Sequence, residues 1–119
     1  MLAELPARVR AMDGCDVVLY QAGADQHIAD PLGGLLTTAE LAARDEIVFS
    51  LLAELGIPVA WNFAGGYQRE EDGSIPKVVE IHSNTARASI ATRAAYTRAH
   101  ASGEAPGSTV SAMVDTSTI

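Results

Sequence analysis

The chain has 119 residues, of which 48% are hydrophobic and 5% aromatic, and its formal net charge is -7. This length and composition suit one soluble domain with a modest core, and no apolar run approaches the roughly 20 residues of a membrane span. The acidic balance and scattered basic residues exclude a nucleic-acid surface, which needs clustered Lys and Arg. A single cysteine, Cys15, and the lack of a signal-peptide pattern predict a cytoplasmic protein.

A short helix and an apolar strand open the predicted fold. Apolar residues at helical spacing predict a helix over residues 6–12, followed by a turn. Residues 15–21 include Asp-Val-Val-Leu-Tyr, which is typical of a buried parallel strand. Residues 26–36 have no sustained period and contain Pro31 and two adjacent glycines, so they are expected to form a loop.

A helix with a distinct start follows this loop. Thr37 and Glu40 have the spacing of a capping box, in which the hydroxyl and the carboxylate each satisfy an unpaired backbone N–H. Gly56 and Pro58 are expected to end the helix. Its predicted apolar face consists of Leu41, Ile47, Val48, Leu51, Leu52 and Leu55. The charged residues Arg44, Asp45 and Glu46 are expected to point mostly away from it.

The second half of the chain predicts another strand and a long helix. Residues 57–63 form an apolar stretch, and a strand, helix and strand over this distance imply a right-handed parallel crossover. Pro76 suits the start of a helix that runs to about residue 98. Its apolar positions are Val78, Val79, Ile81, Thr85, Ala86, Ser89 and Ile90. The domain is thus expected to occupy residues 1–100, with 101–119 as a flexible tail.

Polar residues follow both predicted strands. Asp25 comes after the first strand, and Gly65, Gly66 and Tyr67 come after the second. Because parallel strands end at the same edge of a sheet, where ligands commonly bind, Asp25 and Tyr67 are predicted to meet there.

Each of these residues has more than one reading on its own. Asp25 is either a metal ligand or an acid that caps its own loop. His27 alone suits a solvated loop position, and Asp30 before Pro31 suits a cap on its own turn. Tyr67 is either a donor to a developing oxyanion or an ordinary half-buried tyrosine.

Other candidates favour structural roles. His82 and His100 are expected to be packing or surface residues, and Trp61 to belong to the core. Cys15 fits a small buried side chain better than a nucleophile.

Four motifs in this order resemble the zinc-dependent histone deacetylase superfamily. They are Leu-Tyr-Gln-Ala-Gly-Ala-Asp at 19–25, Asp-Pro-Leu-Gly-Gly-Leu at 30–35, Arg-Asp-Glu-Ile-Val-Phe at 44–49 and Gly-Gly-Tyr-Gln at 65–68. The last two look most like the class IV branch and its bacterial relatives.

The resemblance implies a partial α/β fold of the three-layer arginase/deacetylase type, with about two strands and their flanking helices. It also implies a zinc cofactor and a hydrolase that acts on an acylated lysine or a small acyl-amide. Asp25 matches a zinc ligand of the family, and Tyr67 matches the catalytic tyrosine that stabilises the oxyanion. The implied substrate channel contains Gly65, Gly66 and His27, and the implied structural loop contains Asp30, Pro31 and Gly33.

The chain departs from the family because it has neither the His-His pair nor the upstream Asp-x-His motif. It therefore offers one zinc ligand, whereas catalytic zinc usually has three. We expect the C-terminal segment of a deacetylase that is inactive without an N-terminal partner segment. Two alternatives remain open. The first is a non-catalytic module that associates through its sheet edge and apolar faces with a partner or as a homo-oligomer. The second is a small metal site made of Asp25, His27 and Asp30.

Overall fold

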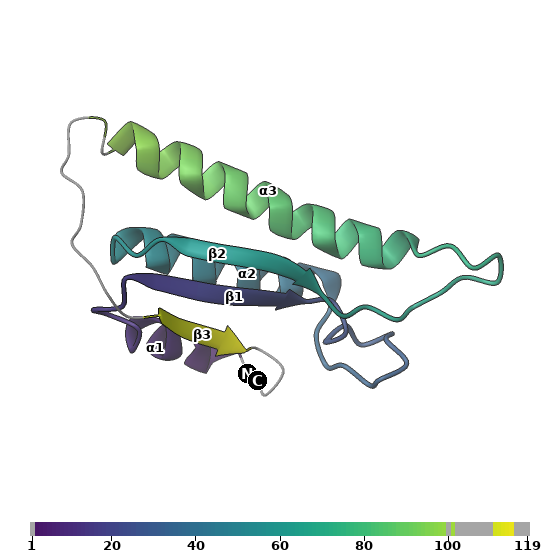
Figure 1. The fold of residues 1–119 in the computed structure, drawn as a ribbon. Helices are drawn as coiled ribbons and strands as arrows, with labels where there is room; N and C mark the ends of the chain where they lie inside the picture. Colours follow the sequence, from purple (N-terminus) through teal and green to yellow (C-terminus); the bar gives the residue numbers. More distant parts are fainter. Residues whose placement is uncertain (1, 100, 102–110, 116–119) are drawn as a thin grey trace.

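The computed structural model describes residues 2–99, 101 and 111–115, which form a mixed α/β fold (Figure 1). In chain order the elements are η1 (Leu2–Glu4), α1 (Leu5–Arg10), β1 (Val17–Gly23), α2 (Thr38–Glu54), β2 (Val59–Ala64), α3 (Pro76–Ala99) and β3 (Ser111–Asp115). The predicted helices and the two predicted strands are therefore present, and both strands lie slightly later in the chain than expected.

The described strands form one parallel sheet. Its order is β2-β1-β3, so β1 is central, and Tyr20 of β1 pairs with Trp61 of β2. The expected parallel pairing of β1 and β2 around α2 is confirmed. The strand β3 was not predicted, since Ser111–Asp115 falls in the expected tail; most of that tail, together with His100, lies outside the described residues.

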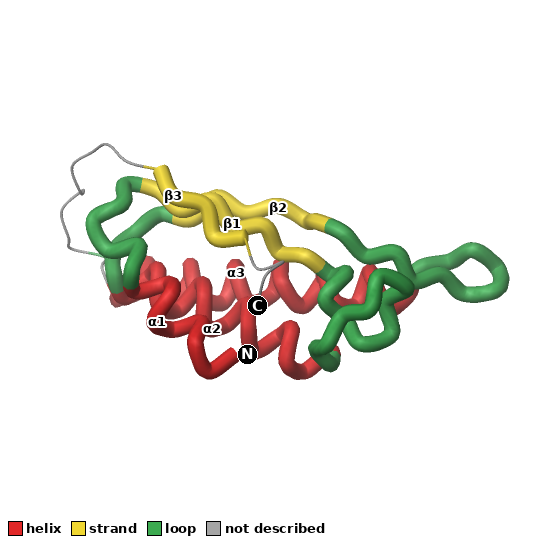
Figure 2. Tube along the Cα trace, turned by 90° about the horizontal axis from the view of Figure 1, so that it is seen from below, coloured by secondary structure: helices red, strands yellow, loops and turns green. Residues whose placement is uncertain are grey.

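The three α-helices lie on one side of the sheet, with α2 between α1 and α3 (Figures 1 and 2). Side chains of β1 alternate accordingly, because successive residues of a strand point to opposite faces. Val18, Tyr20 and Ala22 are buried, whereas Leu19 is 45% exposed. The described residues therefore form two layers and not three.

Helix α2 begins as predicted and buries an unexpected pair of charges. Thr37 Oγ1 accepts from the Glu40 backbone N–H, and the Glu40 carboxylate accepts from the Thr37 backbone N–H at 2.8 Å. The prediction that Arg44 and Asp45 point away from the core is wrong, because both are fully buried. Glu46 alone of the three is exposed. The pair can be buried because each charge has several partners.

A second apolar cluster lies beneath the loops at the carboxyl ends of β1 and β2. It consists of Ala24, Leu36, Leu41, Val78 and Ile81. Only part of the predicted α3 face is used, since Val79 and Ile90 are 55% and 69% exposed. No helix among the described residues is both long and apolar enough to cross a membrane.

Candidate functional site

The loops that follow β1 and β2 meet at one edge of the sheet. The Ala24 N–H donates to Ala64 O at 2.9 Å where the two strands end. Farther out, the Tyr67 N–H donates to Asp30 Oδ2 at 2.8 Å, and Gln68 Nε2 lies 3.1 Å from His27 Nδ1. The expected convergence of the two loops is present, and these polar contacts hold it together.

Asp30 caps its own turn, as predicted, and also holds the second loop. Its Oδ1 accepts from the Leu32 N–H at 3.0 Å, and the Gly33 N–H donates to its backbone oxygen at 2.9 Å. Its Oδ2 takes the Tyr67 N–H, and the residue is 4% exposed. Pro31 lies in the turn at the surface. Asp30, Pro31 and Gly33 therefore form a structural loop whose carboxylate also fixes the backbone of Tyr67.

His27 is not the solvated loop histidine that the sequence favoured, because only 6% of its surface is exposed. Its Nδ1 accepts the Ala29 N–H at 3.2 Å, so the proton belongs on Nε2, which lies 3.1 Å from Thr38 Oγ1. Both ring nitrogens thus bind protein groups. The burial follows from the closing of the loop, since Leu36 N–H donates to Gln26 O at 2.9 Å.

Gly34 permits this closure. A Cβ on Gly34 would lie 2.1 Å from the Gln26 carbonyl carbon, so only glycine allows the two backbone segments to approach so closely. The glycine pair after Pro31 indicates a tight turn. The burial of His27 depends on which segment the chain then packs against, and the glycine pair does not indicate that.

Asp25 lies between two glycines. A Cβ on Gly23 would lie 2.8 Å from Asp25 Oδ1, and one on Gly65, where φ is +57°, would lie 2.2 Å from the same atom. Within the described part of the chain, the Asp25 carboxylate has no hydrogen-bond or ion-pair partner. This favours an accessible carboxylate over the loop-capping alternative.

Tyr67 is held by its backbone and leaves its ring at the surface. The side chain is 54% exposed, and its hydroxyl has no polar partner among the residues that the structure describes. The preceding Gly66 packs inward, since a Cβ there would lie 2.7 Å from Val78 Cγ1 and 3.1 Å from Ala24 Cβ. The backbone is therefore anchored immediately before the tyrosine.

His82 also lies against this edge. Its Nε2 is 3.4 Å from Gly65 O, and its ring packs against Phe63 with the centroids 4.8 Å apart and the planes tilted by 48°. Of the two roles expected for His82, packing or surface, the structure shows packing, and the side chain supports the backbone of the glycine next to Asp25.

A buried ion pair lies behind the site, and the sequence interpretation missed it. Arg44 Nη2 is 2.8 Å from Asp45 Oδ1, and Arg44 Nη1 donates to Gly23 O and to the Gln26 side chain. Burial raises the pKa of Tyr20, so its phenol stays protonated and donates to Asp45. The position of Arg44, three residues after Leu41 and four before Val48, was a usable signal for burial.

The described residues can supply one metal ligand but no complete metal site. They contain no group of three or more His, Cys, Asp or Glu side chains arranged to hold a metal. The hypothesis that Asp25, His27 and Asp30 form such a site is not supported, because His27 and Asp30 bind protein groups instead. Asp25 fits a single zinc ligand, since its oxygens have no protein partner among the described residues, and the two glycines leave the space that the carboxylate itself occupies.

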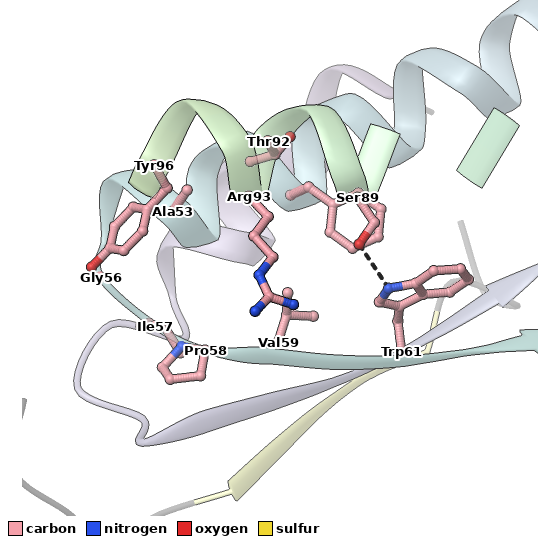
Figure 3. A pocket seen from close by; sticks show the side chains of 11 residues that line it. Ala53, Gly56, Ile57, Pro58, Val59, Trp61, Ser89, Thr92, Arg93 and Tyr96 are labelled. Atoms are coloured by element: carbon pink, nitrogen blue, oxygen red, sulfur yellow. Dashed lines mark hydrogen bonds between the residues drawn. The ribbon is translucent and has the colours of Figure 1, made fainter. Parts of the chain in front are cut away.

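A pocket of about 530 Å³ lies at the opposite, amino-terminal end of the strands (Figure 3). It is lined by apolar side chains of α2 and β2 and by the last turns of α3, from which Arg93 points toward Val59. Trp61, predicted to be core, is partly buried, and its Nε1 donates to Ser89 Oγ at 2.9 Å. The pocket is therefore separate from the residues at the carboxyl edge.

A longer protein is among the relatives that comparison with known proteins finds. The chain is similar to an uncharacterised protein of Picosynechococcus sp., with 39% identity over 74 residues. The match covers 61% of this chain and only 23% of the relative's length. No family model and no solved structure matches the chain.

Proposed function

We propose that this chain is the C-terminal part of a zinc-dependent deacetylase that hydrolyses an acyl-amide such as acetyl-lysine. One observation carries the proposal. The side chains of Gln26, His27, Asp30 and Gln68 bind other protein groups, whereas the Asp25 carboxylate and the Tyr67 hydroxyl have no polar partner among the described residues. The family resemblance assigns the chemistry to those two side chains.

The two residues have different roles in this proposal. Asp25 would hold the metal through a carboxylate oxygen. Zinc would supply a Lewis acid and an activated water. Tyr67 donates a hydrogen bond from its hydroxyl to the oxygen of the amide carbonyl as negative charge develops there. The remaining zinc ligands and a general base would come from protein outside the described residues.

The proposed fold is the three-layer arginase/deacetylase type. Parallel sheets are normally covered on both faces, but here the described helices lie on one (Figure 2). The relative from Picosynechococcus sp. extends well beyond the matched 74 residues. A further segment would therefore cover the face that carries Leu19 and extend the sheet.

A direct test begins with the coding sequence upstream of Met1. We expect an in-frame His-His pair and an Asp-x-His motif, and zinc-dependent release of acetate from an acetyl-lysine peptide by the longer product. Tyr67→Phe should lower kcat by about 10²- to 10³-fold, since one oxyanion donor is lost, without changing the thermal unfolding midpoint. Tyr96→Phe on α3 is the matched control and should keep full activity.

Three results would contradict the proposal. The first needs two findings together: the upstream reading frame contains neither motif, and the purified chain binds no zinc. Another is a longer product in which Tyr67→Phe has no effect on turnover. The third is zinc-dependent hydrolysis by residues 1–119 alone that Tyr67→Phe abolishes, because it would contradict the expectation that the isolated chain is inactive.

A non-catalytic interaction module is the second candidate. Four exposed apolar side chains favour it: Leu19, Ile28, Leu32 and Leu35 are between 45% and 68% exposed. Such surfaces associate with a partner or a second copy. Light scattering of the purified chain would test this proposal, and a stable monomer that does not aggregate at high concentration would count against it.

A further inference from the structure

Arg44 reaches from α2 to both sides of Asp25. One nitrogen of its guanidinium, Nη1, donates to Gly23 O at 2.7 Å and to Gln26 Oε1 at 2.9 Å. Gly23 is the last residue of β1, and Gln26 directly follows Asp25. A single cationic group therefore binds the backbone before Asp25 and the side chain after it.

The opposite side of this guanidinium is held firmly in the core. Arg44 Nε and Nη2 donate to Asp45 Oδ1 at 2.9 and 2.8 Å. Asp45 in turn accepts from the Tyr20 hydroxyl and from the Thr85 hydroxyl of α3. Because both charged residues are fully buried, the planar guanidinium has one orientation, in which Nη1 faces the loop.

We infer that Arg44 is the positioning residue for Asp25, and that its contacts with Gly23 and Gln26 fix the backbone that presents the carboxylate. The inference rests on the proposed function for its consequence, which is a preorganised zinc ligand. Hydrogen bonds from a charged donor are stronger than neutral ones, so this contact can restrain a loop that has just left a strand. If Arg44 only stabilised the core, its bond to Asp45 would be enough. The bonds to the loop acceptors Gly23 O and Gln26 Oε1 would then have no role.

The main experiment removes one of the two loop contacts of Arg44 Nη1 and keeps the buried ion pair. Gln26→Leu eliminates one acceptor of Nη1 at a partly exposed position, so the variant should fold. In the 119-residue chain, amide hydrogen exchange at His27, Ile28 and Asp30 should accelerate about tenfold, while exchange at Val18 in β1 stays unchanged. Gln26→Glu retains an acceptor and should restore wild-type exchange.

Two more variants complete this test. In Arg44→Met, the acceleration at the same loop amides is divided by the acceleration at Val18. This ratio should be larger than the same ratio in Gln26→Leu. Arg87→Met removes an exposed arginine whose hydrogen-bond partner in the described structure is Asn84, and it should leave loop exchange unchanged. Loop exchange within twofold of wild type in both Gln26→Leu and Arg44→Met, relative to the change at Val18, would overturn the role of Arg44.

Zinc affinity tests the consequence in a protein that contains the remaining ligands. Competition with a chelator should show zinc binding about 10- to 100-fold weaker in Gln26→Leu at an unchanged unfolding midpoint, as for other groups that orient a ligand. Unchanged affinity in that variant would overturn the link to the metal. A wild-type protein that binds no zinc would contradict the proposed function. The exchange measurement needs no zinc, so it would still test the role of Arg44.

Discussion

The two ends of the sheet differ in how their side chains are used. At the carboxyl end, polar groups from two loops bind one another, and buried His27 and Asp30 join those loops. At the amino end, apolar side chains of α2 and β2 and several polar side chains of α3 line an open pocket, where Trp61 Nε1 donates to Ser89 Oγ. The difference shows that a large cavity and a preorganised polar site need not coincide.

This contrast explains why the carboxyl end is the better candidate for chemistry. Its scaffold contacts leave the Asp25 carboxylate and the Tyr67 hydroxyl uncommitted in the described structure, but with a well-anchored backbone beneath each. Preorganised groups of this kind are effective in catalysis because little reorganisation is needed when charge develops. The amino end combines apolar area with polar side chains of α3, among them Thr92 and Arg93.

The largest expected effect comes from breaking the ion pair behind the carboxyl end. Asp45→Asn should lower the free energy of unfolding by about 3–5 kcal/mol, since it leaves the buried charge of Arg44 uncompensated. Urea denaturation measures the change. The adjacent, exposed Glu46→Gln is the matched control and should leave the midpoint unchanged. A small loss in Asp45→Asn would show that the pair contributes little.

The second prediction concerns the space beside Asp25. Gly65→Ala should cost about 2–4 kcal/mol, because it adds a clash with the carboxylate to the strain of a positive φ. Gly73→Ala is a close control, since φ is +82° there and a Cβ would meet nothing within 4 Å. It should cost about 1–2 kcal/mol. Equal losses in the two variants would mean that Asp25 moves aside freely.

At the amino end, the effect should be smaller. Ser89→Ala removes the partner of Trp61 Nε1 and should cost about 1 kcal/mol, with a shift in the fluorescence of the single tryptophan. Ser83→Ala, on the same helix, should change neither quantity. An unchanged emission spectrum in Ser89→Ala would contradict the contact.

The smallest effect is a pH dependence at the start of α2. The backbone N–H of Thr37 lowers the pKa of the Glu40 carboxyl, so the ionised form stabilises the folded state. This stability is fully present above the pKa of the unfolded chain and is lost as the pH falls through the lower folded pKa. Wild type should therefore exceed Glu40→Gln in stability at neutral pH, with a difference that vanishes in acid. A difference independent of pH would contradict this assignment.

Local sequence patterns were reliable where a few neighbouring residues decide the outcome. The capping box at Thr37 and Glu40, the apolar strands, and the turn at Asp30 all depend on contacts within a few residues. The meeting of the two loops also followed from sequence, because parallel strands end at one edge. Burial of His27 and of Arg44 did not follow, because it depends on distant partners: Gln68 lies 41 positions from His27, and Gly23 lies 21 positions from Arg44.

The sequence by itself determined the helices, the central parallel pair of strands and the residues available at their carboxyl edge. Only the tertiary structure decided which of those residues are committed to the scaffold, because hydrogen bonding between distant segments is not encoded in local periodicity. It showed that Arg44 belongs to the core, that His27 and Asp30 hold the loops, and that Asp25 lies between two glycines with its carboxylate uncommitted among the described residues.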